Sequence, residues 1–148
     1  MLPLPSDESE AHARLLARIL RTLRRRRGLS AKEVAGRMGL PKRTYELFEA
    51  GTGRLSLPRL QSFAEATDTD AYAILIGLAF GDLAFAIRCA DNKLMTAAVM
   101  SLEDLNREAG DDLALLDPRS VIRAMDTACE ALLAEARARR LPPRPSPG

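Results

Sequence analysis

The sequence predicts an all-α protein, and three observations support this. Alanine, leucine and arginine are abundant among the 148 residues, aromatic residues make up only 4%, and runs of β-branched residues are missing. Ala, Leu and Arg favour helices, whereas strands favour β-branched and aromatic side chains. Apolar residues also recur every three or four positions, as on one face of a helix. The length suits one domain with a substantial core, or a small domain with an extension.

The first helix is expected to begin at Ser6, after a flexible lead-in at residues 1–5. An apolar stripe runs along it, made of Leu15, Leu16, Ile19, Leu20 and Leu23. The helix ends in four consecutive arginines, residues 24–27, followed by Gly28. Four charges exceed what the dipole at a helix C-terminus favours, so we expect phosphate contact from Arg21 or from the run, with Arg25 and Arg26 as candidates. A solvated helix end is the alternative.

Residues 30–51 have the pattern of two short helices that meet at a glycine. Ser30 followed by Glu33 is a capping-box signature, in which the Ser30 hydroxyl accepts from the backbone N–H of Glu33. Gly39 suits a helix end with positive φ, and Pro41 suits the first turn of the next helix. This arrangement predicts a helix-turn-helix whose second helix enters a DNA groove.

The outer face of that second helix is expected to carry Lys42, Arg43, Glu46 and Leu47. Lys and Arg bind guanine O6 and N7, and Glu can accept from cytosine N4, so we predict base contacts from Lys42, Arg43 and Glu46. Two cations at a helix N-terminus oppose the helix dipole, which favours a functional role. A solvated basic face is the alternative. Further candidates for phosphate contact are Lys32, Arg37 and Thr44.

Between residues 15 and 78 the chain resembles the phage-repressor class of helix-turn-helix domains, also called the Cro, lambda-repressor or xenobiotic-response-element family. The matching residues are Leu29, Ser30, Glu33, Val34, Ala35, Met38, Gly39, Leu40, Thr44, Phe48, Glu49 and Gly51. The resemblance implies a five-helix, lambda-repressor-like domain that binds operator DNA as a dimer. It also implies a phosphate contact from Arg54, which follows the recognition helix.

This chain departs from the family at several positions. The family often has glutamine where this chain has Ala31, serine where it has Pro41, and a small aliphatic residue where it has Tyr45. Leu47 occupies a position that is frequently polar. The resemblance therefore gives no operator sequence.

Further helices are expected after residue 56. Apolar patterns indicate helices at residues 57–67 and 71–78, separated by a turn from Asp68 to Asp70. A long helical region follows from residue 81 and can break near residues 91–92. Asp117 and Pro118 start a last helix. We therefore divide the chain into a DNA-binding domain at 6–80, a helical dimerisation or regulatory region at 81–140, and a disordered Pro-rich tail at 141–148.

Charge and composition narrow the function. Residues 11–59 carry thirteen Lys or Arg against three acids, whereas residues 81–148 carry nine against eleven. This asymmetry is typical of a nucleic-acid-binding domain joined to a non-binding one. His12 is the only histidine, and no Gly-rich phosphate loop or Cys/His cluster occurs, so we expect neither an enzyme nor a metal or cofactor. Cys89 and Cys129 are expected to be buried, or to pair at a dimer interface.

Together these patterns predict a cytoplasmic transcriptional regulator. It binds double-stranded operator DNA as a homodimer, with the recognition helix at about residues 41–50 in the major groove. Residues 81–140 hold the two copies of the chain together. No membrane-length apolar run occurs. The alternative is an antitoxin- or adaptor-like interaction module, in which the C-terminal helices bind a protein partner and DNA binding is secondary. The sequence does not decide whether the C-terminal region binds a protein partner or a small-molecule effector.

Overall fold

The computed structural model describes residues 5–53, 55–140 and 145–147, with residues 5–8 described by their backbone alone. Every regular element in these ranges is a helix, so the predicted all-α fold is confirmed. The chain forms two compact units, Met1–Glu103 and Asp104–Gly148. Most of the predicted lead-in at 1–5 and tail at 141–148 lie outside the described residues.

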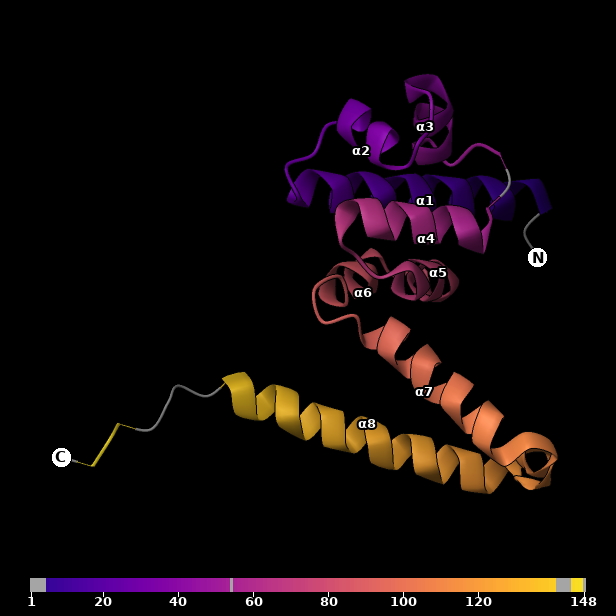
Figure 1. Cartoon of the computed structure of the whole chain (residues 1–148), viewed down its shortest axis with the longest axis vertical. Helices are drawn as coiled ribbons and strands as arrows, with labels where there is room; N and C mark the ends of the chain where they lie inside the picture. Colours follow the sequence, from indigo (N-terminus) through magenta and orange to yellow (C-terminus); the bar gives the residue numbers. More distant parts are fainter. Residues whose placement is uncertain (1–4, 54, 141–144, 148) are drawn as a thin grey trace. The chain divides into compact units, whose positions relative to one another are not determined.

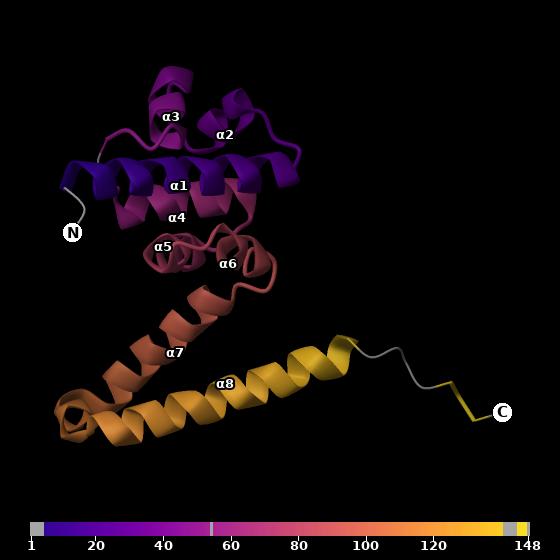
Figure 2. The same ribbon diagram turned by 180° about the vertical axis from the view of Figure 1, so that it is seen from behind.

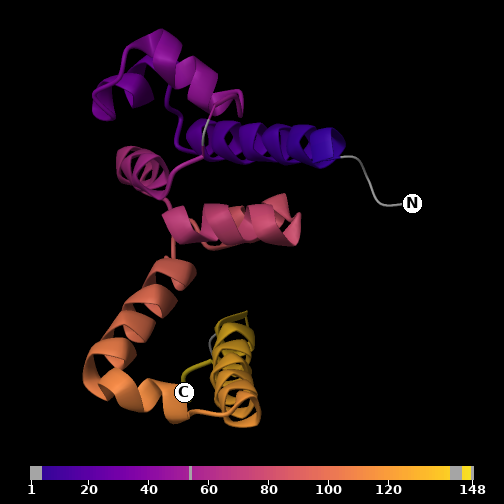
Figure 3. The ribbon, with the colours of Figure 1, turned by 90° about the vertical axis from the view of Figure 1, so that its right-hand side faces the viewer.

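The first unit is a bundle of short helices around one longer helix. Its elements are α1 (Pro5–Arg26), α2 (Ala31–Arg37), α3 (Lys42–Glu49), α4 (Leu57–Thr67), α5 (Ala71–Phe80), α6 (Leu83–Arg88) and the first part of α7 (Leu94–Ala109). Helices α2 and α3 lie on one side of α1, whereas α5 and α6 lie on the other (Figures 1, 2 and 3). The helix-turn-helix formed by α2 and α3 is therefore free on the side away from α1.

The core of this unit joins α1 to the helix-turn-helix and to the helices behind it. The apolar stripe predicted for the first helix supplies four buried residues. The cluster contains Leu16, Ile19, Leu20, Leu23, Val34, Tyr45, Phe48, Leu60, Phe63 and Ile74. The Phe48 ring lies 6.1 Å from the Tyr45 ring and 6.0 Å from the Phe63 ring, measured between centroids. These tilted aromatic contacts fix α3 against α4.

Caps and glycines set the ends of the helix-turn-helix helices. The Ser30 hydroxyl accepts from the backbone N–H of Glu33 at 3.1 Å, which confirms that half of the predicted capping box. Gly39 and Gly51 have φ values of 68° and 77°, in the left-handed region that favours glycine. A Cβ atom at Gly51 would collide with the backbone carbonyl of Ala13 on α1. The end of α3 can therefore approach α1 this closely only with glycine at position 51.

The N-terminal unit continues past residue 80, where the sequence predicted a domain boundary. Helix α6 packs against both α1 and α5, and Ala86 and Cys89 are buried. The helical region breaks between α6 and α7, as predicted near residues 91–92, and Lys93 there has a φ of 56°. These contacts place α6 in the N-terminal unit, which ends at Glu103. The predicted division of function at residue 80 stays a prediction.

Asp70 caps two helices at once. Its side chain is nearly inaccessible, with 1% of the residue's surface exposed. Oδ1 accepts from the backbone N–H of Ala73 at 3.1 Å and from the hydroxyl of Thr96 at 2.6 Å. Oδ2 accepts from the backbone N–H groups of Met95 and Thr96 at 2.9 and 3.2 Å. One carboxylate therefore satisfies free N–H groups at the starts of both α5 and α7.

The second unit contains the end of α7, the 3-10 helix η1 (Gly110–Leu115) and α8 (Pro118–Arg140). Ser120 donates its backbone N–H to Asp117 at 2.9 Å, which confirms the predicted acidic cap and lowers the pKa of Asp117. No residue of α8 is buried. The prediction that Cys129 is buried is therefore wrong, because the apolar stripe of α8 is open to solvent. None of the described helices is long and apolar enough to span a membrane.

Candidate nucleic-acid interface

The second helix of the helix-turn-helix, α3, has two distinct faces. Tyr45, Phe48 and Glu49 are buried and face the bundle. The exposed residues are Lys42, Arg43, Thr44, Glu46, Leu47 and Ala50, the C-cap. The three predicted base-contacting residues therefore share the solvent-facing side of one helix, together with Leu47.

The exposed face of α3 makes few contacts with the rest of the protein. Lys42 and Glu46 approach each other to 3.7 Å, and their side chains are 60% and 50% exposed. An exposed pair at this spacing contributes only a few tenths of a kcal/mol. Among the described residues, Arg43 has no hydrogen-bond or ion-pair partner. These side chains can therefore rearrange to meet a partner at little cost in stability.

A buried ion pair fixes the opposite face of α3 to α1. Arg24 Nε donates to Glu49 Oε1 at 2.6 Å, and Arg24 Nη1 donates to the backbone carbonyl of Leu29 at 2.9 Å. The two side chains are only 13% and 8% exposed. The hydrogen bond with Glu49 raises the pKa of the Arg24 guanidinium, which stays charged. This pair joins α1, the α1–α2 turn and α3.

The Tyr45 hydroxyl lies beside this ion pair. Burial raises the pKa of the Tyr45 phenol well above its usual value, and the charge of Glu49 raises it further. Among the described residues the hydroxyl has no hydrogen-bond partner. An unpartnered buried hydroxyl is a destabilising feature of the core.

Tyr45→Phe is therefore expected to stabilise the protein by about 1 kcal/mol. The change removes the unpartnered hydroxyl and keeps the ring that packs against Phe48. Urea denaturation followed by circular dichroism measures the effect. Tyr72→Phe is the control, because the Tyr72 hydroxyl is near the surface and accepts a hydrogen bond from Gln61. A loss of 1 kcal/mol or more in Tyr45→Phe would show that the hydroxyl is satisfied.

The four arginines at the end of α1 divide into two pairs. Arg24 is held by Glu49, and Arg27 donates to the carbonyls of Thr67 and Asp68 and to the Asp91 carboxylate, at 3.0, 2.6 and 2.6 Å. Arg25 and Arg26 are exposed. Residues three apart share a helix face, so Arg24 and Arg27 turn inward together while the two predicted phosphate contacts turn outward.

The other predicted phosphate contacts lie at different places. Lys32 is exposed in the first turn of α2, and Thr44 is exposed on α3. Arg37, also exposed, ends α2, where its guanidinium donates to the Ala66 carbonyl at 2.9 Å. That bond ties α2 to α4, so Arg37 already has a structural partner. Arg54 lies outside the described residues.

A groove runs along the end of α3 and contains Arg59, a basic residue that the sequence analysis did not select as a phosphate contact. It has a volume of about 530 Å³ and is lined by Thr44, Leu47, Phe48, Thr52, Gly53, Ser56 and Arg59. Ser56 caps α4 by accepting from the backbone N–H of Arg59 at 3.3 Å. The groove therefore brings the Ser56 hydroxyl and the Arg59 guanidinium next to the exposed face of α3, and both groups suit a phosphate. The position of Arg59 in the first turn of α4, shortly after the predicted recognition helix, could have indicated this role from the sequence.

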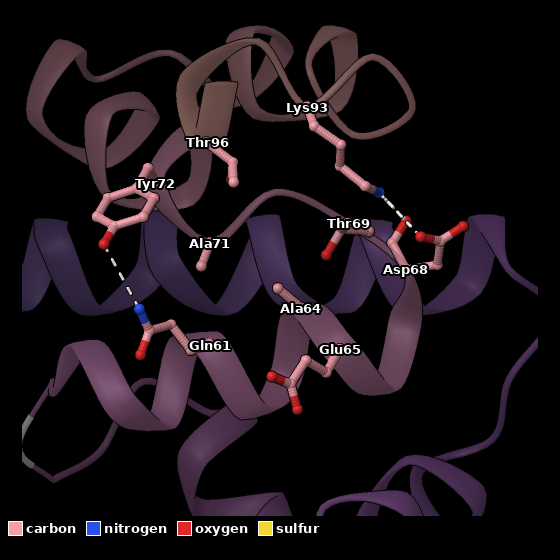
Figure 4. Close-up of a pocket in the computed structure, with 9 residues that line it drawn as sticks. All are labelled: Gln61, Ala64, Glu65, Asp68, Thr69, Ala71, Tyr72, Lys93 and Thr96. Atoms are coloured by element: carbon pink, nitrogen blue, oxygen red, sulfur yellow. Dashed lines mark hydrogen bonds and ion pairs between the residues drawn. The ribbon is translucent and has the colours of Figure 1, made fainter. Parts of the chain in front are cut away.

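A second cavity lies away from this face, between α4, α5 and the start of α7 (Figure 4). Its volume is about 490 Å³, and its lining includes Gln61, Glu65, Tyr72, Lys93 and Thr96. Lys93 Nζ lies 3.0 Å from Asp68 Oδ1 and also donates to the backbone carbonyls of Asp68 and Ala90. Its cation is therefore already used to hold the α6–α7 turn against the end of α4.

Comparison with known proteins agrees with the arrangement of α2 and α3. A family model described as a helix-turn-helix domain matches residues 15–72, which cover the second half of α1 and all of α2, α3 and α4. This part of the chain is therefore similar to helix-turn-helix domains. No curated protein and no solved structure matches the chain.

Proposed function

We propose that the protein is a sequence-specific transcriptional regulator of the lambda-repressor-like type. It binds operator DNA as a homodimer and places residues 41–50 in the major groove. Lys42, Arg43 and Glu46 contact base edges. The exposed residues Arg25, Arg26 and Lys32 contact phosphates, and Arg54, Thr44, Arg37 and Arg59 are further candidates.

The observation that carries this proposal is the division of α3 into a fixed face and a free face. Tyr45, Phe48 and Glu49 anchor the helix in the core, so its orientation is set before any ligand binds. Arg43 and Lys42 project from the opposite side. A rigid helix that presents the Arg43 guanidinium and the weakly paired Lys42 ammonium suits the groove edge of guanine.

The open apolar stripe of the second unit supports dimerisation through residues 81–140. The exposed apolar residues of this unit are Leu105, Leu115, Leu116, Val121, Ile122, Met125, Leu132 and Leu133. Those of α8 recur at helical spacing, and exposed apolar side chains gathered on one helix face are typical of an interaction site. A second copy of the chain is the partner that would also supply a second helix-turn-helix for a two-fold operator.

Selection of pooled genomic fragments at two salt concentrations tests the proposal. The wild-type protein is expected to enrich a short inverted repeat, and higher salt weakens binding because phosphate contacts release counterions. Arg43→Ala is expected to cost about 1–3 kcal/mol and to loosen the preference at one base pair. The double variant Lys42→Ala/Arg43→Ala is expected to abolish enrichment.

The control for Arg43→Ala is Arg88→Ala, which removes one charge from an exposed position on α6, outside the apolar stripe of α8. It is expected to enrich the same repeat as the wild type. If Arg43→Ala lowers the binding affinity equally for every DNA sequence, Arg43 contacts a phosphate and not a base. No enrichment by the wild type would overturn the proposed function, and a stoichiometric protein partner of the second unit would then indicate the adaptor role.

A further inference from the structure

Leu47 is the one large apolar residue on the exposed face of α3. Its surface is 49% exposed, although it lies on a helix whose other large apolar residues, Tyr45 and Phe48, are buried. Single exposed leucines are common on protein surfaces and need no explanation by themselves. The position of Leu47 on the helix is what makes it informative.

Leu47 lies at the centre of the face that points away from the core. Successive residues of an α-helix are about 100° apart, so the buried residues Tyr45, Phe48 and Glu49 occupy one sector. The opposite sector is centred on Arg43 and Leu47, which are four positions apart and therefore neighbours. Any DNA base that Arg43 reaches therefore lies close to Leu47.

The chemistry of the major groove offers one apolar group to such a side chain. Thymine presents a 5-methyl group there, whereas the other groove-edge groups of the four bases are donors and acceptors. We infer that Leu47 selects thymine by contact with this methyl group. This inference rests on the proposed function, because it requires α3 to lie in the major groove.

The spacing along α3 places this thymine relative to the base read by Arg43. Four residues advance about 6 Å along a helix, and adjacent base pairs are about 3.4 Å apart. The thymine therefore lies within about two base pairs of the base that Arg43 contacts. The groove on the protein surface that Leu47 lines also contains Ser56 and Arg59, which would hold a DNA phosphate near this thymine.

A uracil scan of the selected operator tests the inference. Each thymine in one half-site is replaced in turn by uracil, which lacks the 5-methyl group and keeps every hydrogen-bonding group. Wild-type protein is expected to lose about fourfold in affinity at one position, the effect of removing one buried methyl group from the contact. Leu47→Ala is expected to bind thymine and uracil operators equally at that position.

Leu55→Ala is the matched control, because Leu55 is also an exposed leucine, at 38%, but lies in the α3–α4 loop. It is expected to keep the fourfold difference. Sedimentation of Leu47→Ala is expected to show the same mass as the wild type. A change in mass would place Leu47 in a protein interface and overturn the inference.

The failures of the inference and of the proposed function are distinguishable. If the operator is bound and no uracil substitution matters, or if Leu47→Ala keeps the difference, the thymine contact is wrong and the regulator remains. If wild-type protein selects no operator, both are overturned.

Discussion

Asp70→Ala is expected to lower the free energy of unfolding by about 3–4 kcal/mol. The change removes four hydrogen bonds from one buried carboxylate, two of them to the backbone at the start of α7 and one at the start of α5. Loss of one cap costs about 1 kcal/mol, and each N–H left without a partner in a buried site adds a desolvation cost of about 1–3 kcal/mol. Urea denaturation followed by circular dichroism measures the change.

Asp82→Ala provides the comparison for Asp70. Asp82 caps α6 alone, through one bond to the backbone N–H of Ala84 at 2.9 Å. It is expected to cost about 1 kcal/mol. Equal losses in the two variants would mean that the cap on α7 contributes nothing to stability. Thr96→Val, which removes only the hydroxyl bond to Asp70, is expected to fall between the wild type and Asp70→Ala.

Glu49→Ala is expected to cost about 3–5 kcal/mol. The change leaves the guanidinium of Arg24 without its carboxylate in a site where the side chain is only 13% exposed. Breaking one side of a buried ion pair costs this much because the remaining charge stays buried and uncompensated. Thermal and urea unfolding measure the loss, and Glu46→Ala on the exposed face of α3 is expected to change stability by less than about 0.5 kcal/mol.

Replacing both Arg24 and Glu49 distinguishes the contribution of the ion pair from the cost of leaving one charge buried alone. Arg24→Met/Glu49→Leu fills a similar volume with apolar atoms, so it is expected to recover most of the stability lost by Glu49→Ala. A double variant as unstable as Glu49→Ala would show that the hydrogen bond from Arg24 to the Leu29 carbonyl matters more than the pair. Together with the single variants Arg24→Met and Glu49→Leu, the double variant closes a double-mutant cycle that gives the coupling free energy.

Local patterns predicted most of the N-terminal fold. The cap at Ser30, the glycine at position 39 and the apolar stripe of α1 all depend on residues within a few turns of each other. Within one helix or turn, the spacing of residues along the sequence determines which of them lie close together. The same holds for the free face of α3, because a helix period assigns Lys42, Arg43 and Glu46 to one side.

Interactions between distant residues could not be predicted in this way. Arg24 and Arg27 pair with residues 25 and 64 positions away, so the sequence alone did not separate them from Arg25 and Arg26. Asp70 was expected only in a turn, and its second role depends on where α7 begins. Cys129 was expected in a core because apolar periodicity reports which face is apolar and not whether that face is covered.

The split of α3 into an anchored and a free face has a consequence for how this chain can change by substitution. Glycine at 51, the Arg24–Glu49 pair and the aromatic contacts hold the helix, and none of them involves the residues that point outward. Substitutions between helix-compatible side chains at the outward positions are therefore expected to change stability little. The surface that α3 offers to a partner and the contacts that hold the fold thus depend on separate sets of residues.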